Sequence, residues 1–285
     1  MTTPLSFAVI GHPVAHSRSP EIHEAFAAQF GIDLTYERLD AEPEAFKISV
    51  QRFFDHGGTG LNVTVPFKER AWQMANTHLS PRARDAGAVN TLWVANEHIH
   101  GCNTDGVGLV TDLKRLSMPV NGANLMILGA GGAARGVLGP LLAAGAAHIT
   151  VLNRTAQRAH DLIDAWVLTH QNDKPKLLSG GFEGNTAWPI PDLVINATSS
   201  SLQGEALVLP AALWASNACA YDMMYGAQPT TFMQQANEAG SQQIADGLGM
   251  LVGQASESFR LWHGKTPTIE PVVSQIRAQL RTHVR

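Results

Sequence analysis

The sequence feature that most constrains the fold is the stretch from Asn124 to Arg158. It begins with an apolar segment, residues 125–128, which is typical of a buried strand and runs directly into the glycine turn Gly129-Ala130-Gly131-Gly132-Ala133-Ala134. A helical pattern rich in Ala and Leu follows, and a second apolar segment comes after it at 148–152. A strand, a glycine turn, a helix and a second strand in this order predict a βαβ unit of a Rossmann-like, doubly wound α/β sheet.

The glycine turn fits the Gly-x-Gly-x-x-Gly/Ala pattern of dinucleotide-binding proteins. Gly129 would allow the tight turn, Gly131 the close approach of the backbone to a pyrophosphate, and Ala134 the close packing of helix against strand. The helix N-terminus offers free N–H groups and a positive dipole end to phosphate. An ordinary tight turn in an alanine-rich α/β protein would show the same residues. The predicted cofactor contacts in the turn are Gly129, Ala130, Gly131, Gly132 and Ala133.

Polar residues after the second strand narrow the choice of cofactor. NAD-selective sites usually have Asp or Glu at this point, where the carboxylate binds the ribose hydroxyls. This chain instead has Asn153, Arg154 and Thr155, and Arg158 follows one helical turn after Arg154. Two guanidinium groups and a hydroxyl suit a 2′-phosphate, so the sequence predicts NADP as the cofactor.

The composition argues against several classes of function. The chain has 285 residues, a net charge of -4 and no basic run, so a nucleic-acid partner is not expected. A signal-peptide pattern is absent, and no segment approaches the roughly 20 apolar residues of a membrane span. The distant cysteines Cys102 and Cys219 predict no disulfide, which makes the cytoplasm the expected compartment. His98 and His100 share a strand face without a third ligand in view, so both are expected to face solvent and no metal is expected.

The first hundred residues are expected to form a compact α/β unit. Ser19-Pro20 predicts the start of a helix that ends at Gly31, with Ser19 as its N-cap. The other elements predicted here are strands at 7–10 and 34–39, a helix at 43–55, and a hairpin of strands 87–94 and 98–102.

Residues 61–65 alternate strictly between apolar and polar side chains. The pattern predicts a strand, ended by Pro66, with Leu61, Val63 and Val65 on one face and Asn62 and Thr64 on the other. Asn62 and Thr64 can therefore contact one ligand together, although ordinary polar residues at a sheet edge show the same pattern. After this strand, helices are predicted to begin at Lys68 and at Asn103-Thr104-Asp105-Gly106.

The second half of the chain continues the α/β pattern. A helix to about His170, a polar linker at 171–176, strands at 193–196 and 218–221, and two terminal helices are expected. Small residues at 197–201 follow a strand, which is where an α/β sheet lines its ligand crevice.

Taken together, motifs along nearly the whole chain resemble the shikimate dehydrogenase family. The glycine turn is one of them, and the others are Ala15-His16-Ser17-Arg18-Ser19-Pro20, Asn62-Val63-Thr64-Val65-Pro66-Phe67-Lys68, Gly87-Ala88-Val89-Asn90-Thr91, Asn103-Thr104-Asp105-Gly106, Asn153-Arg154-Thr155, Asn196-Ala197-Thr198-Ser199, Tyr221-Asp222-Met223 and Asp246-Gly247-Leu248-Gly249-Met250-Leu251. They occur in the order that the family shows.

The resemblance implies NADPH-dependent reduction of 3-dehydroshikimate to shikimate in aromatic amino-acid biosynthesis. It implies a substrate-binding domain of residues 1–105 and 249–285, with an NADP-binding domain of residues 106–248 inserted between them. The partner would be a small-molecule substrate, a ring that carries a carboxylate and several hydroxyls. A monomer and a homodimer are both compatible with the sequence.

The resemblance also implies roles for single residues. Ser17 and Ser19 would bind the substrate carboxylate, and Tyr225 would close the substrate site. The substrate hydroxyls and the reacting centre would be held by Asn62, Thr64, Asn90, Asp105 and Gln254. The cofactor would also contact Thr198, with Met223 and the backbone of Gly247 at the nicotinamide.

Reduction of a ketone requires an acid for the developing alkoxide, and Lys68 is the candidate, with Asp105 orienting it. Both residues lie in the most specific substrate-domain motifs. Taken alone, Lys68 is equally typical of a solvated lysine in the first turn of a helix, and Asp105 of a helix N-cap.

Two alternatives remain open. A quinate/shikimate dehydrogenase that accepts NAD shares nearly every motif, but the lack of an acidic residue at Asn153 or Thr155 and the paired Ser17 and Ser19 argue against it. A non-catalytic regulatory module that binds the same metabolite is disfavoured because Lys68, Asp105 and the glycine turn are all intact. One segment, Pro81-Arg82-Ala83-Arg84, departs from the acidic sequence expected there.

Overall fold

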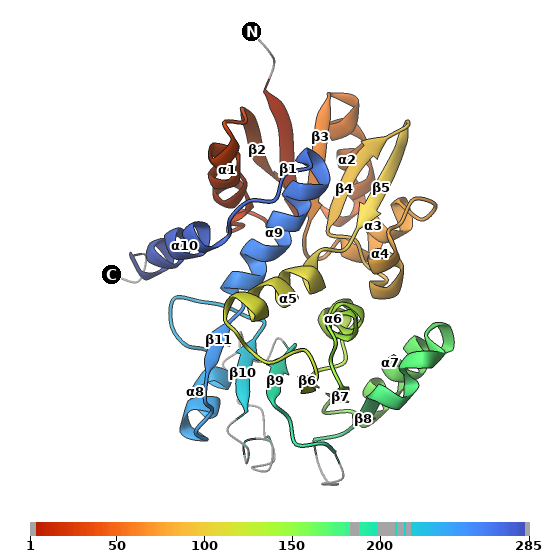
Figure 1. Ribbon diagram of the computed structural model, residues 1–285. Helices are drawn as coiled ribbons and strands as arrows, with labels where there is room; N and C mark the ends of the chain where they lie inside the picture. Colours follow the sequence, from red (N-terminus) through yellow and green to blue (C-terminus); the bar gives the residue numbers. More distant parts are fainter. Residues whose placement is uncertain (1–3, 183–187, 199–208, 210–213, 215–217, 283–285) are drawn as a thin grey trace. The chain divides into compact units, whose positions relative to one another are not determined.

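The chain forms two compact units, and Figure 1 shows their helices and strands in a computed structural model that describes residues 4–182, 188–198, 209, 214 and 218–282. The first unit comprises residues 1–108 and 252–276, and the second comprises residues 109–251 and 277–285. The divisions follow Gly108 and Leu251 rather than Asp105 and Leu248, and the end of the chain groups with the second unit. The small residues predicted at 199–201 lie outside the described residues.

The first unit is built on a mixed five-stranded sheet. Its strands lie in the order β2-β1-β3-β4-β5, where β1 is parallel to β2 and β3, and β4 is antiparallel to β3 and β5. The predicted hairpin closes through Asn96 and Glu97, both with positive φ, as a tight hairpin turn requires. The strands are β1 (Leu5–Gly11), β2 (Leu34–Asp40), β3 (Gly58–Val63), β4 (Thr91–Ala95) and β5 (His98–Cys102).

Helices cover both faces of this sheet. Ala8 and Ile10 of β1 belong to one buried apolar cluster and Phe7 to another, because successive side chains point to opposite faces. The first cluster is covered by η1 (Pro43–Ala45), α2 (Phe46–Asp55), α3 (Lys68–Met74) and α4 (Pro81–Ala86). The other face is covered by α1 (Ser19–Phe30) and by α9 (Leu248–His263), whose Trp262 ring lies 4.9 Å from that of Phe7.

The end of β3 differs from the prediction. Leu61 and Val63 are buried in the first cluster as expected, but the strand ends at Val63. Val65 is 69% exposed, so its place on the buried face was wrong. The apolar/polar alternation in the sequence continues to Val65, but the chain leaves the sheet after Val63. The alternation alone therefore does not show where the strand ends.

The start of α1 also differs from the prediction. Ser19 is the first residue of the helix, and the N-cap residue is Arg18, which makes no side-chain capping bond. The N–H of Ser19 is instead satisfied by the Ser17 hydroxyl, at 3.3 Å. Ser19 as the N-cap was therefore wrong, because the preceding serine takes the acceptor role.

The second unit contains a six-stranded sheet in which every pairing is parallel. Its order is β11-β10-β9-β6-β7-β8, so the strand order reverses between β6 and β9. This is the doubly wound Rossmann order read from its far edge, which confirms the predicted fold class. The strands are β6 (Asn124–Leu128), β7 (His148–Leu152), β8 (Leu177–Gly180), β9 (Leu193–Asn196), β10 (Cys219–Asp222) and β11 (Ile244–Asp246).

Apolar residues from these strands are buried on both sides of the sheet. One cluster packs against α5, α6 and α7, and the other packs against α8. Both short strands β8 and β11 and the 3₁₀ helix η2 were missed in the sequence, where 171–176 reads as a polar linker. The helices are α5 (Asp105–Arg115), α6 (Gly132–Ala143), α7 (Ala156–Thr169), η2 (Gln171–Lys176), α8 (Thr231–Glu238) and α10 (Glu270–Thr282).

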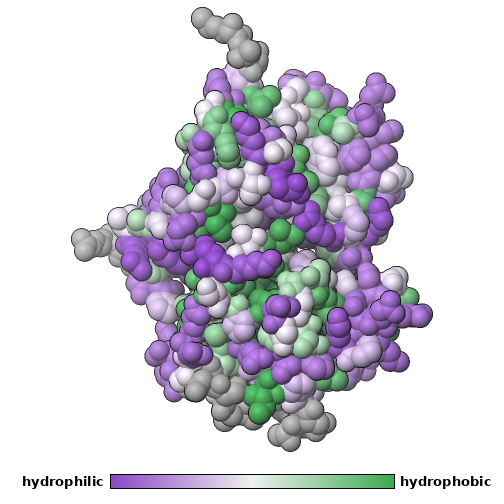
Figure 2. Space-filling model, in the orientation of Figure 1, coloured by the Kyte–Doolittle hydropathy of each residue, from purple (hydrophilic) through white to green (hydrophobic). Residues whose placement is uncertain are grey.

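Figure 2 shows mainly hydrophilic side chains on the visible face, with apolar side chains in small groups among them. In the described part of the chain, no helix is both long enough and apolar enough to cross a bilayer.

α1 carries a buried histidine on its inner face. His23 is 1% exposed, and its ring stacks on Tyr36 with 4.6 Å between ring centroids. Burial, together with the nearby His263, lowers the pKa of His23 from 6.5 to about 3. The imidazole is therefore neutral in the folded protein at physiological pH.

This histidine makes stability depend on pH. An unfolded imidazole takes up a proton near pH 6.5, whereas His23 in the folded protein takes one up only near pH 3. The free energy of unfolding should therefore decrease as the pH falls below about 6.5, by up to about 1.4 kcal/mol per pH unit. Denaturant unfolding of the wild type and His23→Phe at pH 7, 6, 5 and 4 measures this contribution. The variant should lose less stability on acidification, and equal pH dependence in the two proteins would contradict the assignment.

Candidate functional site

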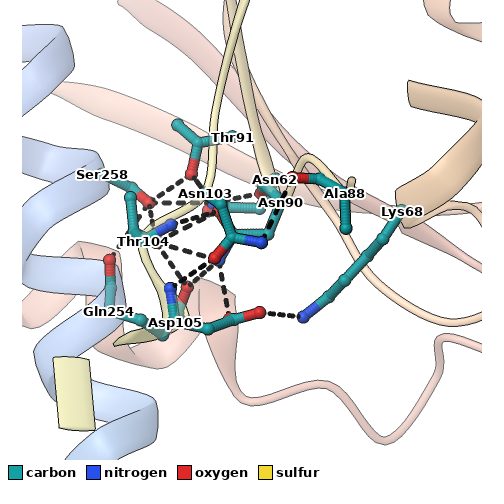
Figure 3. A network of polar contacts seen from close by, with 10 residues as sticks. All are labelled: Asn62, Lys68, Ala88, Asn90, Thr91, Asn103, Thr104, Asp105, Gln254 and Ser258. Carbon is teal, nitrogen blue, oxygen red and sulfur yellow. Dashed lines mark hydrogen bonds and ion pairs between the residues drawn. The ribbon is translucent and has the colours of Figure 1, made fainter. Parts of the chain in front are cut away.

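An ion pair lies at one end of a polar cluster in the first unit, drawn in Figure 3. Lys68 begins α3 and Asp105 begins α5, and Lys68 Nζ donates to Asp105 Oδ2 at 2.6 Å. The two side chains are 32% and 19% exposed, so a small ligand can reach them. A charged donor next to an acceptor suits proton transfer and the binding of a hydroxyl.

Asp105 is held in place from two further directions. Its Oδ1 accepts a hydrogen bond from Asn90 Nδ2 at 2.8 Å, and its backbone N–H donates to Asn103 Oδ1 at 3.0 Å. Asn103 in turn donates to the carbonyl of Ala88 at 3.2 Å. The carboxylate therefore has a defined orientation towards Lys68.

The structure brings three predicted substrate-binding amides into the same cluster. Asn62 and Asn90 are only 5% and 2% exposed, and Asn90 Nδ2 lies 3.2 Å from Gln254 Oε1. Asn62 donates to the carbonyl of Asn90 at 3.1 Å and accepts from the Tyr36 hydroxyl at 2.6 Å. Burial raises the pKa of Tyr36 well above 10, so this hydroxyl is a donor.

The predicted serine pair lies in the loop before α1 and at its first residue. The two hydroxyls are 3.2 Å apart, where Ser17 donates to Ser19. Arg38 holds the loop, because its Nε and Nη2 both donate to the carbonyl of Ser17, at 2.9 and 2.7 Å. Thr64 follows β3, and its methyl group occupies the space beside Gly11, where an added Cβ would lie 2.4 Å from it.

Sequence reasoning missed several residues of this cluster. Asn103 and Thr104 lie inside the motif Asn103-Thr104-Asp105-Gly106, which was a usable signal. No sequence signal marks Tyr36, Arg38 or Ser258, because each forms a hydrogen bond with a residue that is distant in the sequence.

The segment Pro81–Arg84 forms most of α4, with Ser80 as its N-cap. Arg82 pairs with Glu257 of α9 at 2.7 Å, and Arg84 donates to the carbonyl of Leu79. Of the basic residues that depart from the expected acidic sequence, Arg82 thus links α4 to α9, and Arg84 binds the backbone just before α4.

In the second unit, the glycine turn lies where the strand order reverses. Gly129 has a φ of 106°, and a Cβ added there would lie 3.0 Å from the methyl group of Thr198. Gly131 is the N-cap residue of α6, and open space surrounds both Gly131 and Gly132. A backbone with open space at a helix N-terminus suits a phosphate group.

A buried carboxylate organises the neighbouring strand ends. Asp222 is fully buried and accepts hydrogen bonds from Asn196 Nδ2 at 3.1 Å and from the Thr230 hydroxyl at 2.6 Å. Asn196 in turn accepts from the Thr198 hydroxyl at 2.7 Å. Thr198, just after β9, is therefore held next to the glycine turn.

The predicted nicotinamide contacts lie side by side. A Cβ added to Gly247 would lie 2.1 Å from the carbonyl oxygen of Met223, so only glycine fits there. Tyr225 follows β10 in this same unit.

The predicted phosphate-binding residues follow β7. Asn153 Nδ2 donates to the carbonyl of Thr155, which is the N-cap residue of α7. Arg154 and Arg158 are exposed, and neither has an ion-pair partner among the described residues. Two available guanidinium groups at the end of a Rossmann strand suit a phosphate monoester.

The histidine pair has a third ring beside it, which the sequence did not show. His78 stacks on His98 at 4.4 Å between ring centroids and lies 4.8 Å from His100. His98 is exposed, but His100 is only partly so. Among the described residues, no group of three or more His, Cys, Asp and Glu side chains could hold a metal ion.

Family models match most of the chain. Residues 9–92 match the shikimate dehydrogenase substrate binding domain, residues 112–203 match shikimate / quinate 5-dehydrogenase, and residues 247–277 match the shikimate 5′-dehydrogenase C-terminal domain.

Known proteins resemble it over nearly their full length. The shikimate dehydrogenase (NADP(+)) of Bordetella petrii is 56% identical over 277 residues, which are 96% of each chain. A solved Ael1 enzyme from Pseudomonas putida is 37% identical with a TM-score of 0.87, covering 95% of this chain and 97% of that one. Shikimate 5-dehydrogenase from Thermus thermophilus, solved with NADP(H) and shikimate, is 34% identical with a TM-score of 0.81, covering 97% and 100%. The chain therefore belongs to the shikimate dehydrogenase family.

Proposed function

We propose that this protein catalyses the reversible NADPH-dependent reduction of 3-dehydroshikimate to shikimate, a step of aromatic amino-acid biosynthesis. The observation that carries the proposal is the ion pair of Lys68 and Asp105, joined to Asn90 in an accessible polar cluster. The names of the relatives, which include shikimate dehydrogenase (NADP(+)), support the same activity.

Substrate and cofactor would bind to two different domains. Residues 1–105 and 249–285 would form the substrate-binding domain, and residues 106–248 would bind NADP. The open helix N-terminus of α6 and the two available arginines support the second assignment. Oligomeric state stays open between monomer and homodimer. The two buried free thiols, Cys102 and Cys219, suit a cytoplasmic enzyme.

Substrate recognition would use the hydroxyl and amide groups of the first unit. Ser17 and Ser19 would bind the carboxylate, and Arg38 supports this role by holding their loop. Tyr225 would close the site. The ring hydroxyls and the reacting centre would be held by Asn62, Thr64, Asn90, Asp105 and Gln254.

The residues of the glycine turn would fit the cofactor phosphates, and those after β7 would fit the 2′-phosphate. Met223 and Gly247 would face the nicotinamide, with Thr198 beside Gly129. The bound dinucleotide supplies hydride chemistry at the ketone carbon.

The chain itself must then provide a proton and a stable environment for the alkoxide. In this mechanism the Lys68 ammonium faces the carbonyl oxygen of the substrate and transfers a proton to it as the negative charge develops. Asp105 keeps the ammonium in position through the 2.6 Å contact and accepts a hydrogen bond from a substrate hydroxyl. In the reverse direction, neutral Lys68 takes the hydroxyl proton of shikimate.

An assay of the purified protein tests the function directly. Shikimate and quinate, each supplied with NADP and with NAD, should give the highest kcat/KM for shikimate with NADP. A preference for NADP of about tenfold or more is expected from one charge-assisted phosphate contact. Equal use of NAD and quinate would favour the quinate/shikimate dehydrogenase alternative. Complete lack of nucleotide reduction by a protein that binds shikimate would favour the regulatory module.

The role of Lys68 is tested by Lys68→Ala. Loss of the general acid should lower kcat by about 10²- to 10⁴-fold, with a smaller change in the KM for shikimate. The matched control is Lys47→Ala, which removes an exposed lysine of α2. Steady-state kinetics of both variants show whether Lys68 acts as the general acid. Near-normal turnover of the Lys68 variant would remove this residue from the catalytic role.

The cofactor prediction is tested by Arg154→Ala and Arg158→Ala. Each substitution removes a charged hydrogen-bonding partner, so the KM for NADP should rise about tenfold or more, while the KM for NAD should hardly change. Arg281→Ala, at an exposed position of α10, is the control. If both variants keep the wild-type KM for NADP, the phosphate site lies elsewhere.

A further inference from the structure

We propose that Ser258 and Thr91 are positioning residues of the substrate site, which join the amides of Asn62 and Asn90 into one buried hydrogen-bond chain that reaches Asp105. The inference rests on the proposed function. Neither hydroxyl is exposed, since both residues are fully buried, so neither is expected to touch the substrate itself.

Ser258 lies beside Thr91 and Thr104 at one side of the polar cluster (Figure 3). It lies one helical turn after Gln254 on α9, and its hydroxyl donates to the Gln254 carbonyl oxygen at 3.1 Å. Its hydroxyl also lies 3.1 Å from Asn62 Nδ2 and 2.7 Å from the Thr91 hydroxyl. Ser258 thus contacts its own helix, which carries Gln254, and the strands β3 and β4. Asn62 lies on β3, and Asn90 directly precedes β4.

The donors and acceptors are defined at the two ends of this hydrogen-bond chain. At one end the protonated Tyr36 hydroxyl donates to Asn62 Oδ1, which leaves Asn62 Nδ2 to donate to Ser258 Oγ. At the other end the Asp105 carboxylate can only accept, so Asn90 donates to it through Nδ2.

The middle of the chain connects these ends. Asn90 Oδ1 accepts from the Thr91 hydroxyl at 3.0 Å, and the Thr91 and Ser258 hydroxyls lie 2.7 Å apart. The hydrogen bonds therefore connect Tyr36, Asn62, Ser258, Thr91 and Asn90 to Asp105 without a break. Hydrogen bonds connected in this way polarise one another in a buried environment.

The hydrogen-bond chain matters for the reaction because it fixes which amide atom, the nitrogen or the oxygen, each side chain turns towards a ligand. An Asn90 amide turned the other way would place its oxygen against Asp105 Oδ1, bringing two acceptors together. The same buried hydroxyls thus favour the arrangement in which Asp105 keeps its other oxygen for Lys68.

The experiment compares Ser258→Ala with Ser256→Ala. Ser256 lies on the same helix and is 6% exposed, but its hydroxyl lies outside the chain of hydrogen bonds, so it is a matched control for the loss of a buried serine hydroxyl. A second pair, Thr91→Val and Thr91→Ser, removes or retains a hydroxyl at the next link. Kinetics with shikimate and NADP give kcat and both KM values for each variant.

A positioning role predicts a selective effect. Ser258→Ala and Thr91→Val should each raise the KM for shikimate by about three- to tenfold, since each breaks one buried hydrogen bond. The KM for NADP should stay at the wild-type value, Ser256→Ala should match the wild type, and Thr91→Ser should restore most of the affinity. The double variant Ser258→Ala/Thr91→Val should be less impaired than the product of the single effects, because both substitutions interrupt the same chain.

Other outcomes overturn the inference. A lower kcat with both KM values unchanged would indicate a loss of folded protein only, and an equal effect of Ser256→Ala would indicate general packing. If Ser258→Ala does not fold, the Thr91 pair decides, and equal kinetics of Thr91→Val and Thr91→Ser would exclude the role. Wild-type protein that does not turn over shikimate would overturn the proposed function, whereas active wild type with an unaffected Ser258→Ala variant would overturn this inference alone.

Discussion

The amide of Asn90 donates a hydrogen bond to Asp105 at 2.8 Å, and the polar cluster of the first unit depends on it. Asn90 is 2% exposed, so protein groups must replace water as its partners. Its oxygen accepts from the backbone N–H of Thr104 at 2.9 Å, which opposes a reversed amide. Asn90 thereby connects β3, through its backbone carbonyl, with the start of α5 and the middle of α9, through its side chain. The orientation of the ion pair follows from these contacts.

In the second unit, the buried group that holds the neighbouring elements together is Asp222. The carboxylate of Asp222 binds Asn196 and Thr230, so the ends of two adjacent parallel strands have one common anchor. β9 lies next to β6 at the reversal of strand order, and Thr198 therefore packs against Gly129. The position of the glycine turn is thus a consequence of sheet topology together with one buried acid.

Much of the fold could be predicted because the central strands carry strong local patterns. Residues 125–128, 149–152 and 193–196 are mostly apolar and are buried on both faces, as expected for strands of a covered parallel sheet. The predictions failed at short elements and at element ends. β8 and β11 have only four and three residues, too few to show a period. Val65 continues an alternation after the sheet has ended, and Ser19 begins α1 instead of capping it, with its own N–H bound to the Ser17 hydroxyl.

The sequence by itself determined the fold class, the glycine turn and the residue types for an acid pair and a phosphate site, because each is written in neighbouring residues or in motif order. Only the tertiary structure decided which buried groups hold them. Ser258 is 196 positions from Asn62 and 167 from Thr91, and they meet because α9 packs across the sheet. A hydrogen bond between such distant residues depends on how helix and sheet bury their apolar faces, and no local pattern records that packing.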